Sequence, residues 1–220
     1  MKTTDFKLKL DAFGAKVHEV YDPLVGPGGA AENVDYYIFQ TAVQEEPELL
    51  VMGINPGGDC KKGVRDATGS IDTTYNAYFD GNDHSWFQTL RRIFGTPMLT
   101  QQLRNCVGTN NYYINTGHMQ KLPEDKDFKR NAVILSRELV DEIIRPKRIV
   151  ALGTDPFYML NRGPIRTKQF GHVSFKYGHR GDMLVGLVYN PSQRNANRYY
   201  TDAWIGDWQK ALEWFLTEAK

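Results

Sequence analysis

Three asparagine-containing segments hold the residues best suited to chemistry. Each follows a short apolar run: Asn55-Pro56-Gly57-Gly58, Asn115-Thr116-Gly117-His118 and Asn190-Pro191-Ser192. An Asn amide offers one oxygen acceptor and two N–H donors, but it does not accept a proton near neutral pH. Such side chains can orient a water molecule or read the edge of a flat polar ligand. Each segment alone is also typical of an ordinary turn, so the elements that carry them matter.

Apolar runs and helical patterns alternate along the chain. The runs predict strands over 49–54, 112–115, 148–153, 172–177 and 183–189, the last two paired around 178–181. The helical patterns predict helices over 83–94 with Asp83 as N-cap, from Asp127 to Pro146, around Pro156, and from Thr201 or Asp202 onward.

This alternation predicts a three-layer α/β/α sandwich with a mostly parallel central sheet, formed by residues 1–220 as a single domain. In such sheets ligands bind beyond the carboxyl ends of the strands, where the three Asn segments fall.

Composition narrows the class of protein. Of 220 residues, 41% are hydrophobic and 24% charged, which is typical of a globular domain. No apolar run reaches the roughly 18 residues of a membrane span, and the N-terminus lacks an apolar signal core. We expect a monomer in the cytoplasm, or in the nucleus of a eukaryote, without membrane contact or secretion. Cys60 and Cys106 are too few for a disulfide framework.

Several familiar motifs are missing. Gly53 and Gly58 have the spacing of a phosphate-binding loop, but Asp59-Cys60 stands where that loop needs Lys and Ser or Thr. The five His residues lack metal-ligand spacing, and no four-Cys set could hold an iron–sulfur cluster. We therefore expect neither a metal nor another cofactor.

Charge is unevenly distributed along the chain. Residues 161–198 contain seven Lys and Arg side chains and one Asp, whereas residues 1–50 contain four Lys and nine acids. A local basic excess predicts contact with phosphates, as in nucleic acid; a solvated surface is the alternative.

Two motifs resemble the signatures of the uracil-DNA glycosylase superfamily: Gly53-Ile54-Asn55-Pro56-Gly57 and Asn190-Pro191-Ser192-Gln193-Arg194-Asn195. They are most similar to the single-strand-selective monofunctional and mismatch-specific branches. Between them, residues 145–153 are similar to a strand of the same superfamily, and order and spacing agree over residues 49–200. The second motif departs from the monofunctional branch, which usually has His where this chain has Asn190.

The resemblance implies a DNA repair enzyme that flips uracil or a related deaminated base out of DNA and hydrolyses its N-glycosidic bond. The motifs contain no Lys that could attack the sugar, so the enzyme would be monofunctional and hydrolytic. By the same resemblance, Asn55 positions the attacking water and Asn190 donates to uracil O2. Asn115 reads the base edge.

The resemblance also implies neighbours for these amides. Gly53 and Ile54 would contact the base, and Phe79 would stack on it, with Tyr75 and Tyr78 as alternatives. DNA would lie against a set of motif residues, with Arg194 on a loop pushed into the duplex: Pro56, Gly57, Pro191, Ser192, Gln193, Arg194 and Asn195. Two other readings stay open: a weak or inactive member of the fold that binds DNA or a nucleobase, and a nucleotide-handling α/β enzyme.

Overall fold

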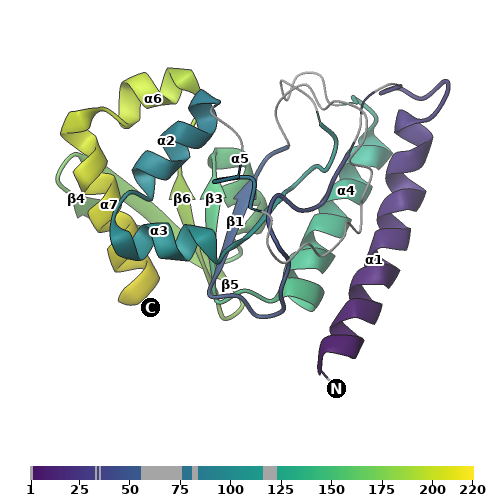
Figure 1. Ribbon diagram of the computed structural model, residues 1–220, viewed down its shortest axis with the longest axis horizontal. Coiled ribbons are helices and arrows are strands. Elements are labelled where there is room, and N and C mark those ends of the chain that lie inside the picture. Colours follow the sequence, from purple (N-terminus) through teal and green to yellow (C-terminus); the bar gives the residue numbers. More distant parts are fainter. Residues whose placement is uncertain (1, 33, 35, 56–75, 81–83, 116–122) are drawn as a thin grey trace.

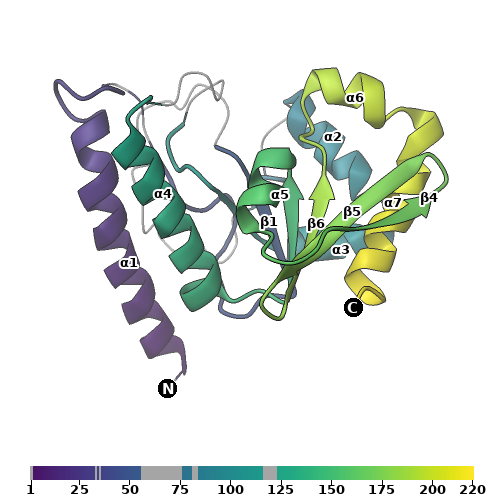
Figure 2. The same cartoon turned by 180° about the vertical axis from the view of Figure 1, so that it is seen from behind.

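A six-stranded sheet forms the centre of the molecule, with helices on both faces (Figures 1 and 2). This computed structural model describes residues 2–32, 34, 36–55, 76–80, 84–115 and 123–220. The strands, in the order in which they pair, are β2 (Val107–Asn110), β1 (Leu49–Gly53), β3 (Arg148–Leu152), β6 (Met183–Val188), β5 (Val173–Arg180) and β4 (Arg166–Phe170).

The first four strands in this order are mutually parallel, and β5 and β4 add antiparallel strands at one edge. The predicted three-layer α/β/α architecture with a mostly parallel sheet is confirmed.

Helices of the two faces enclose two separate cores. Each core is a separate set of buried side chains, because alternate residues of a strand point to opposite faces of the sheet. On one face lie α1 (Lys2–Val25), α4 (Lys126–Glu138) with its π-helical continuation η2 (Leu139–Ile144), and α5 (Thr154–Leu160). On the other lie α2 (Ser85–Ile93), α3 (Pro97–Arg104) and α7 (Asp202–Thr217), and α6 (Gln193–Tyr199) lies across the top in Figure 1.

The helices begin close to their predicted positions, but with different caps. His84 caps α2 by accepting the Trp86 N–H, and Asp83 lies outside the described residues. Asp125, not Asp127, caps α4, because its carboxylate accepts the N–H of Phe128. The helical run ends before Pro146 as predicted, with Arg145 in the left-handed region at φ 50°.

The second strand differs from its prediction. Residues 112–115 form no strand; only Ile114 makes an isolated bridge, with Tyr36. The strand beside β1 is β2, which ends at Asn110. The apolar run after it is buried by packing against α1, as in the 5.5 Å ring contact between Tyr113 and Tyr21. The hydrophobicity of this run therefore reflects its packing against α1, and not a strand position in the sheet.

Besides β2, four elements were not predicted: α1, α3, β4 and α6. The helix α1 buries residues at helical spacing, among them Phe6, Leu10, Phe13 and Val17. The edge strand β4 pairs with β5, and β5 pairs with β6 around Gly181. Among the described residues, no helix is long and apolar enough to cross a membrane.

Buried phenols predict a loss of stability at alkaline pH. Burial raises the pKa of five tyrosines and of the Cys106 thiol; the tyrosines are Tyr21, Tyr78, Tyr112, Tyr113 and Tyr200. In the unfolded chain these phenols ionise near pH 10, so above this pH the unfolded state gives up protons that the folded state keeps. We expect stability to fall by about 1.4 kcal/mol per pH unit for each such group.

Urea unfolding at increasing pH, combined with tyrosinate absorbance, measures this effect. Tyrosines that all ionise near pH 10 in a protein that stays folded would contradict it.

Candidate functional site

The sheet register brings Asn55 and Asn190 to the same level. Met52 pairs with Ala151, which in turn pairs with Leu187, so these residues lie at one height in β1, β3 and β6. Asn55 follows Met52 by the same number of residues as Asn190 follows Leu187. Their strands are two spacings apart, or about 10 Å. The two predicted catalytic amides therefore leave the same edge of the sheet, on either side of the end of β3.

The end of β3 carries no side chain between them. Gly153 follows β3, has φ 123°, and donates its N–H to the Val188 carbonyl at 2.7 Å. This conformation favours glycine. A Cβ atom at this position would lie 3.9 Å from the Cβ of Asn190. Gly153 thus places no side chain between Asn55 and Asn190 at the end of β3.

A third amide lies at the end of β2, next to Gly53. Asn110 pairs with Gly53 across the strands and is only 2% exposed. Its Nδ2 is buried and has no hydrogen-bond partner among the described residues. A buried amide that lacks an acceptor is costly, and such groups commonly meet a water molecule or a ligand. Sequence reasoning missed Asn110 because it placed the strand too late.

Gly53 has to be a glycine so that Asn110 fits. A Cβ on Gly53 would lie 2.4 Å from Asn110 Oδ1. We expect Gly53→Ala to lower the free energy of unfolding by about 1–3 kcal/mol, because the buried amide must shift. Urea unfolding measures this change. The matched control is Gly206→Ala in α7, where nothing lies within 4 Å of the new Cβ; equal effects of the two substitutions would contradict the packing argument.

Asn115 lies five residues after the end of β2. It is 6% exposed and follows Ile114, which bridges Tyr36 beside α1. The prediction that Asn115 ends a strand is wrong; its role in reading a base stays a prediction. Asn111 has a structural environment, since its Oδ1 accepts from Ser136 at 3.2 Å. Asn110 and Asn111 both lie beside the end of β1, since the Asn111 N–H donates to the Gly53 carbonyl at 3.0 Å, but only the Asn111 side chain is engaged with α4.

The side chain of Asn190 is held by a tryptophan. Trp86 Nε1 donates to Asn190 Oδ1 at 2.8 Å, so α2 on one face of the sheet is tied to the segment after β6. Asn190 is half-buried. The bond occupies the amide oxygen and leaves the NH₂ group as the available part of the side chain.

The main chain around Asn190 is held as well. Its carbonyl accepts from Ser192 N and from Asn195 Nδ2, each at 2.8 Å. Ser192 also caps α6, with Asn195 N at 3.4 Å from Ser192 Oγ. Pro191 is buried. The polar groups of Ser192 and Asn195 therefore stabilise the turn that presents Asn190.

The predicted insertion loop is helical. Gln193 and Arg194 begin α6, and both are exposed. Ser192 terminates the turn and starts the helix, which is the normal behaviour of a serine at this position. A cationic side chain in the first turn of an exposed helix is available to a phosphate backbone, so contact of these two residues with DNA stays a prediction.

Phe79 packs against a cation. The guanidinium carbon of Arg104 lies 4.1 Å from the centroid of its ring. Arg104 ends α3, shortly before the start of β2, and thus belongs to the opposite edge of the sheet. The alternative Tyr78 is fully buried and donates its hydroxyl to Gln40. The described contacts do not bring Phe79 to the amides, and its stacking role stays a prediction.

Part of the first motif cannot be placed. Pro56 and Gly57 lie outside the described residues, as do Tyr75 and the Asp59-Cys60 pair. Ile54 is described: its carbonyl accepts from Tyr112 N at 2.8 Å, and its side chain packs against the core that includes α1 and α4. Gly53 and Ile54 therefore form the edge from which Asn55 emerges.

The basic residues of 161–198 do not form one face. Arg180 is buried in an ion pair with Asp141, and Lys168 covers the Trp214 ring at 4.0 Å. Arg194 and Arg198 are exposed on α6. Fewer of these cations are therefore available to contact phosphates than the charge count suggested.

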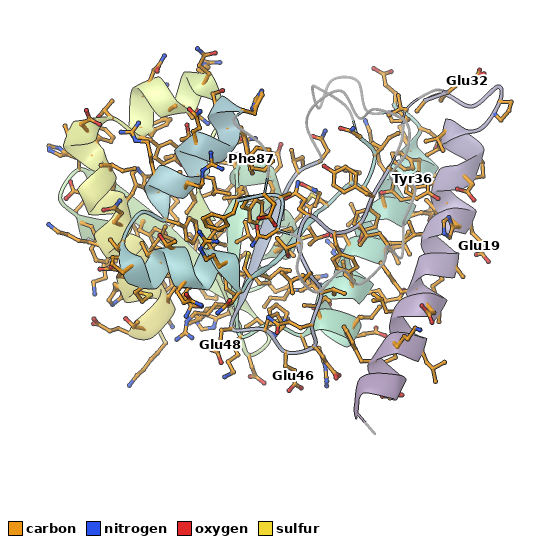
Figure 3. The ribbon with its side chains drawn as sticks, viewed as in Figure 1. Glu19, Glu32, Tyr36, Glu46, Glu48 and Phe87 are labelled. Atoms are coloured by element: carbon orange, nitrogen blue, oxygen red, sulfur yellow. The ribbon has the colours of Figure 1, made fainter. Side chains whose placement is uncertain are left out.

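A cavity of about 1000 Å³ lies at the opposite edge of the sheet, around the starts of β3 and β6. Two of its cations pair with carboxylates: Arg180 with Asp141, and Lys147 with Glu48. Figure 3 shows Glu48 at the lower end of the molecule and Phe87, next to Trp86, well above it. This cavity is separate from the amide site.

Within the described part of the chain, no group of three or more His, Cys, Asp or Glu side chains could hold a metal ion. No model of a known protein family matches the chain, and a search of curated proteins finds no similar sequence. The resemblance of the motifs therefore depends on the residues themselves.

Proposed function

We propose that the protein is a monofunctional DNA glycosylase that hydrolyses the N-glycosidic bond of uracil, or of a related deaminated base, flipped out of DNA. One observation carries the proposal: the register of β1, β3 and β6 brings Asn55 and Asn190 to one level at the carboxyl edge of the sheet. The two signature motifs are far apart in sequence, and this proximity is what a shared site requires.

The reaction makes two demands that amides can meet. The oxygen of the water forms a bond to C1′ of the sugar while the bond between C1′ and the base nitrogen breaks. The electron pair of the broken bond leaves with the base. The proton of the water passes to solvent or to the released base. Asn55 holds the water under C1′, and Asn190 donates to the oxygen on which negative charge develops.

Base reading falls to Asn110 rather than Asn115 in this proposal. The support is its place at the end of β2, beside Gly53, and its buried NH₂ group, for which no described residue supplies an acceptor. Uracil presents an N3–H donor and an O4 acceptor, and cytosine presents the opposite pattern. A fixed amide distinguishes the two, because the wrong base leaves buried polar groups unpaired.

The enzyme should be slow. Asn55 can orient water but cannot remove its proton, so the rate depends mainly on stabilising the leaving base. The exposed Arg194 on α6, next to the site, supports DNA as the partner. The protein needs no cofactor in this mechanism.

A panel of single- and double-stranded oligonucleotides tests the proposal. The lesions are uracil, hypoxanthine, xanthine and thymine mismatched with guanine, each incubated with the wild-type protein and with the Asn55→Ala variant. We expect release of at least one base by the wild type only. Binding without release would favour an inactive member of the fold, and competition by free nucleotides over DNA would favour a nucleotide-handling enzyme.

A further inference from the structure

We propose that Trp86 is a positioning residue that fixes the Asn190 amide with its NH₂ group toward the leaving base. The observation is the 2.8 Å bond from the indole Nε1 to Asn190 Oδ1, between residues 104 positions apart in sequence. The inference rests on the proposed function. It adds a residue outside both signature motifs and defines the chemical class of the base.

The indole decides which end of the amide faces the site. An indole N–H is a donor only, so the atom that it meets must be the amide oxygen. Rotating the amide by half a turn would oppose two donors at Trp86 and would turn the oxygen toward the base. Because negative charge develops on the base, the amide oxygen would repel the base in this second orientation. Trp86 therefore excludes the unproductive orientation.

Trp86 is itself well fixed. It lies in the first turn of α2, where its backbone N–H donates to the Nδ1 of His84, the N-cap. Its ring packs edge-to-face against Phe87, with centroids 5.0 Å apart, and at 6.4 Å from Tyr78. The segment after β6 is fixed from its own side by the two hydrogen bonds to the Asn190 carbonyl. The donor is thus oriented before any base arrives, as electrostatic catalysis requires.

A site that offers only donors here favours one class of base. In pyrimidines, the carbonyl oxygen O2 adjoins the glycosidic nitrogen and takes up charge as the bond breaks. In purines, no exocyclic oxygen lies at that position. The structure thus points to a 2-oxopyrimidine as leaving group, and we expect uracil to be released faster than hypoxanthine or xanthine.

The substitution Trp86→Phe tests the role, with Trp214→Phe as the matched control. Trp214 is also partly buried, but its ring packs against Phe170 and Lys168 of β4 and Tyr177 of β5. We expect Trp86→Phe to slow single-turnover release of uracil about tenfold, a part of the 10²–10³ that loss of a whole donor costs. The loss should be smaller for 5-fluorouracil, whose anion needs less stabilisation, and affinity for an uncleavable DNA analogue should not change.

An NMR measurement separates this inference from the proposed function. The indole N–H resonance of Trp86 should move in Asn190→Leu, which has no acceptor, and keep its protection from exchange in Asn190→Asp, which retains one. Wild-type rates in Trp86→Phe, equal losses for uracil and 5-fluorouracil, or an unmoved resonance in Asn190→Leu would overturn the positioning role. A wild-type protein that releases no base, while the resonance responds as expected, would refute the proposed function instead.

Discussion

Asn55→Ala is expected to lower the rate of base release by about 10² or more, because the attacking water loses the group that holds it under C1′. The side chain follows β1 at the carboxyl edge of the sheet, at the level of Asn190. Single-turnover release of uracil from an oligonucleotide, at enzyme concentrations above saturation, measures the chemical step directly.

A suitable control for this variant is Asn105→Ala. Asn105 is an exposed asparagine at the end of α3, on the opposite edge of the sheet. It should release base at the wild-type rate, and both variants should unfold at the wild-type urea concentration. An Asn55→Ala protein that remains fully active would disprove the water-positioning role.

Substitutions of Asn190 should have the second large effect on the rate of base release, lowering it in one variant and raising it in another. Asn190→Ala removes the donor to the leaving base and should cost about 10²–10³ in rate. Asn190→His should increase the rate, since one imidazole nitrogen can accept from Trp86 while the other donates to the base. A cationic imidazole would carry N–H on both nitrogens and would oppose the Trp86 donor, so the neutral form is the one that fits this site.

The pH–rate profile distinguishes the two Asn190 variants. With His at position 190, the rate should fall as pH drops through the pKa of the imidazole, because the cation cannot accept from Trp86, whereas the wild-type protein should lack this step. A histidine variant with the wild-type rate and a flat profile would show that residue 190 does not face the leaving group.

Much of the parallel sheet could be predicted from the sequence. Leu49–Gly53 and Arg148–Leu152 are buried on both faces and therefore read as continuous apolar runs. By contrast, β2 reads as Val-Gly-Thr-Asn. Gly108 is required there because the Tyr78 hydroxyl lies 2.4 Å from where its Cβ would be. Such a requirement is tertiary, and no local pattern reveals it.

The site could be predicted in part for the same reason. The Asn-Pro segments identified Asn55 and Asn190, and the register places them at one level. The contact between Trp86 and Asn190 joins residues of different elements that are 104 positions apart, so no local pattern predicts it. The edge strand β4 gave no signal because four of its five residues are exposed.

The strand order has a consequence for how the protein is made. Asn110, Asn55 and Asn190 come from three strands, and the last of these, β6, ends at Val188, late in the chain. A polypeptide still emerging from the ribosome cannot assemble these amides until β6 and the segment after it have been synthesised. Because the pairings join distant residues, assembly has to wait for loop closure over long separations. Truncated products that lack β6 would thus lack the assembled set of amides.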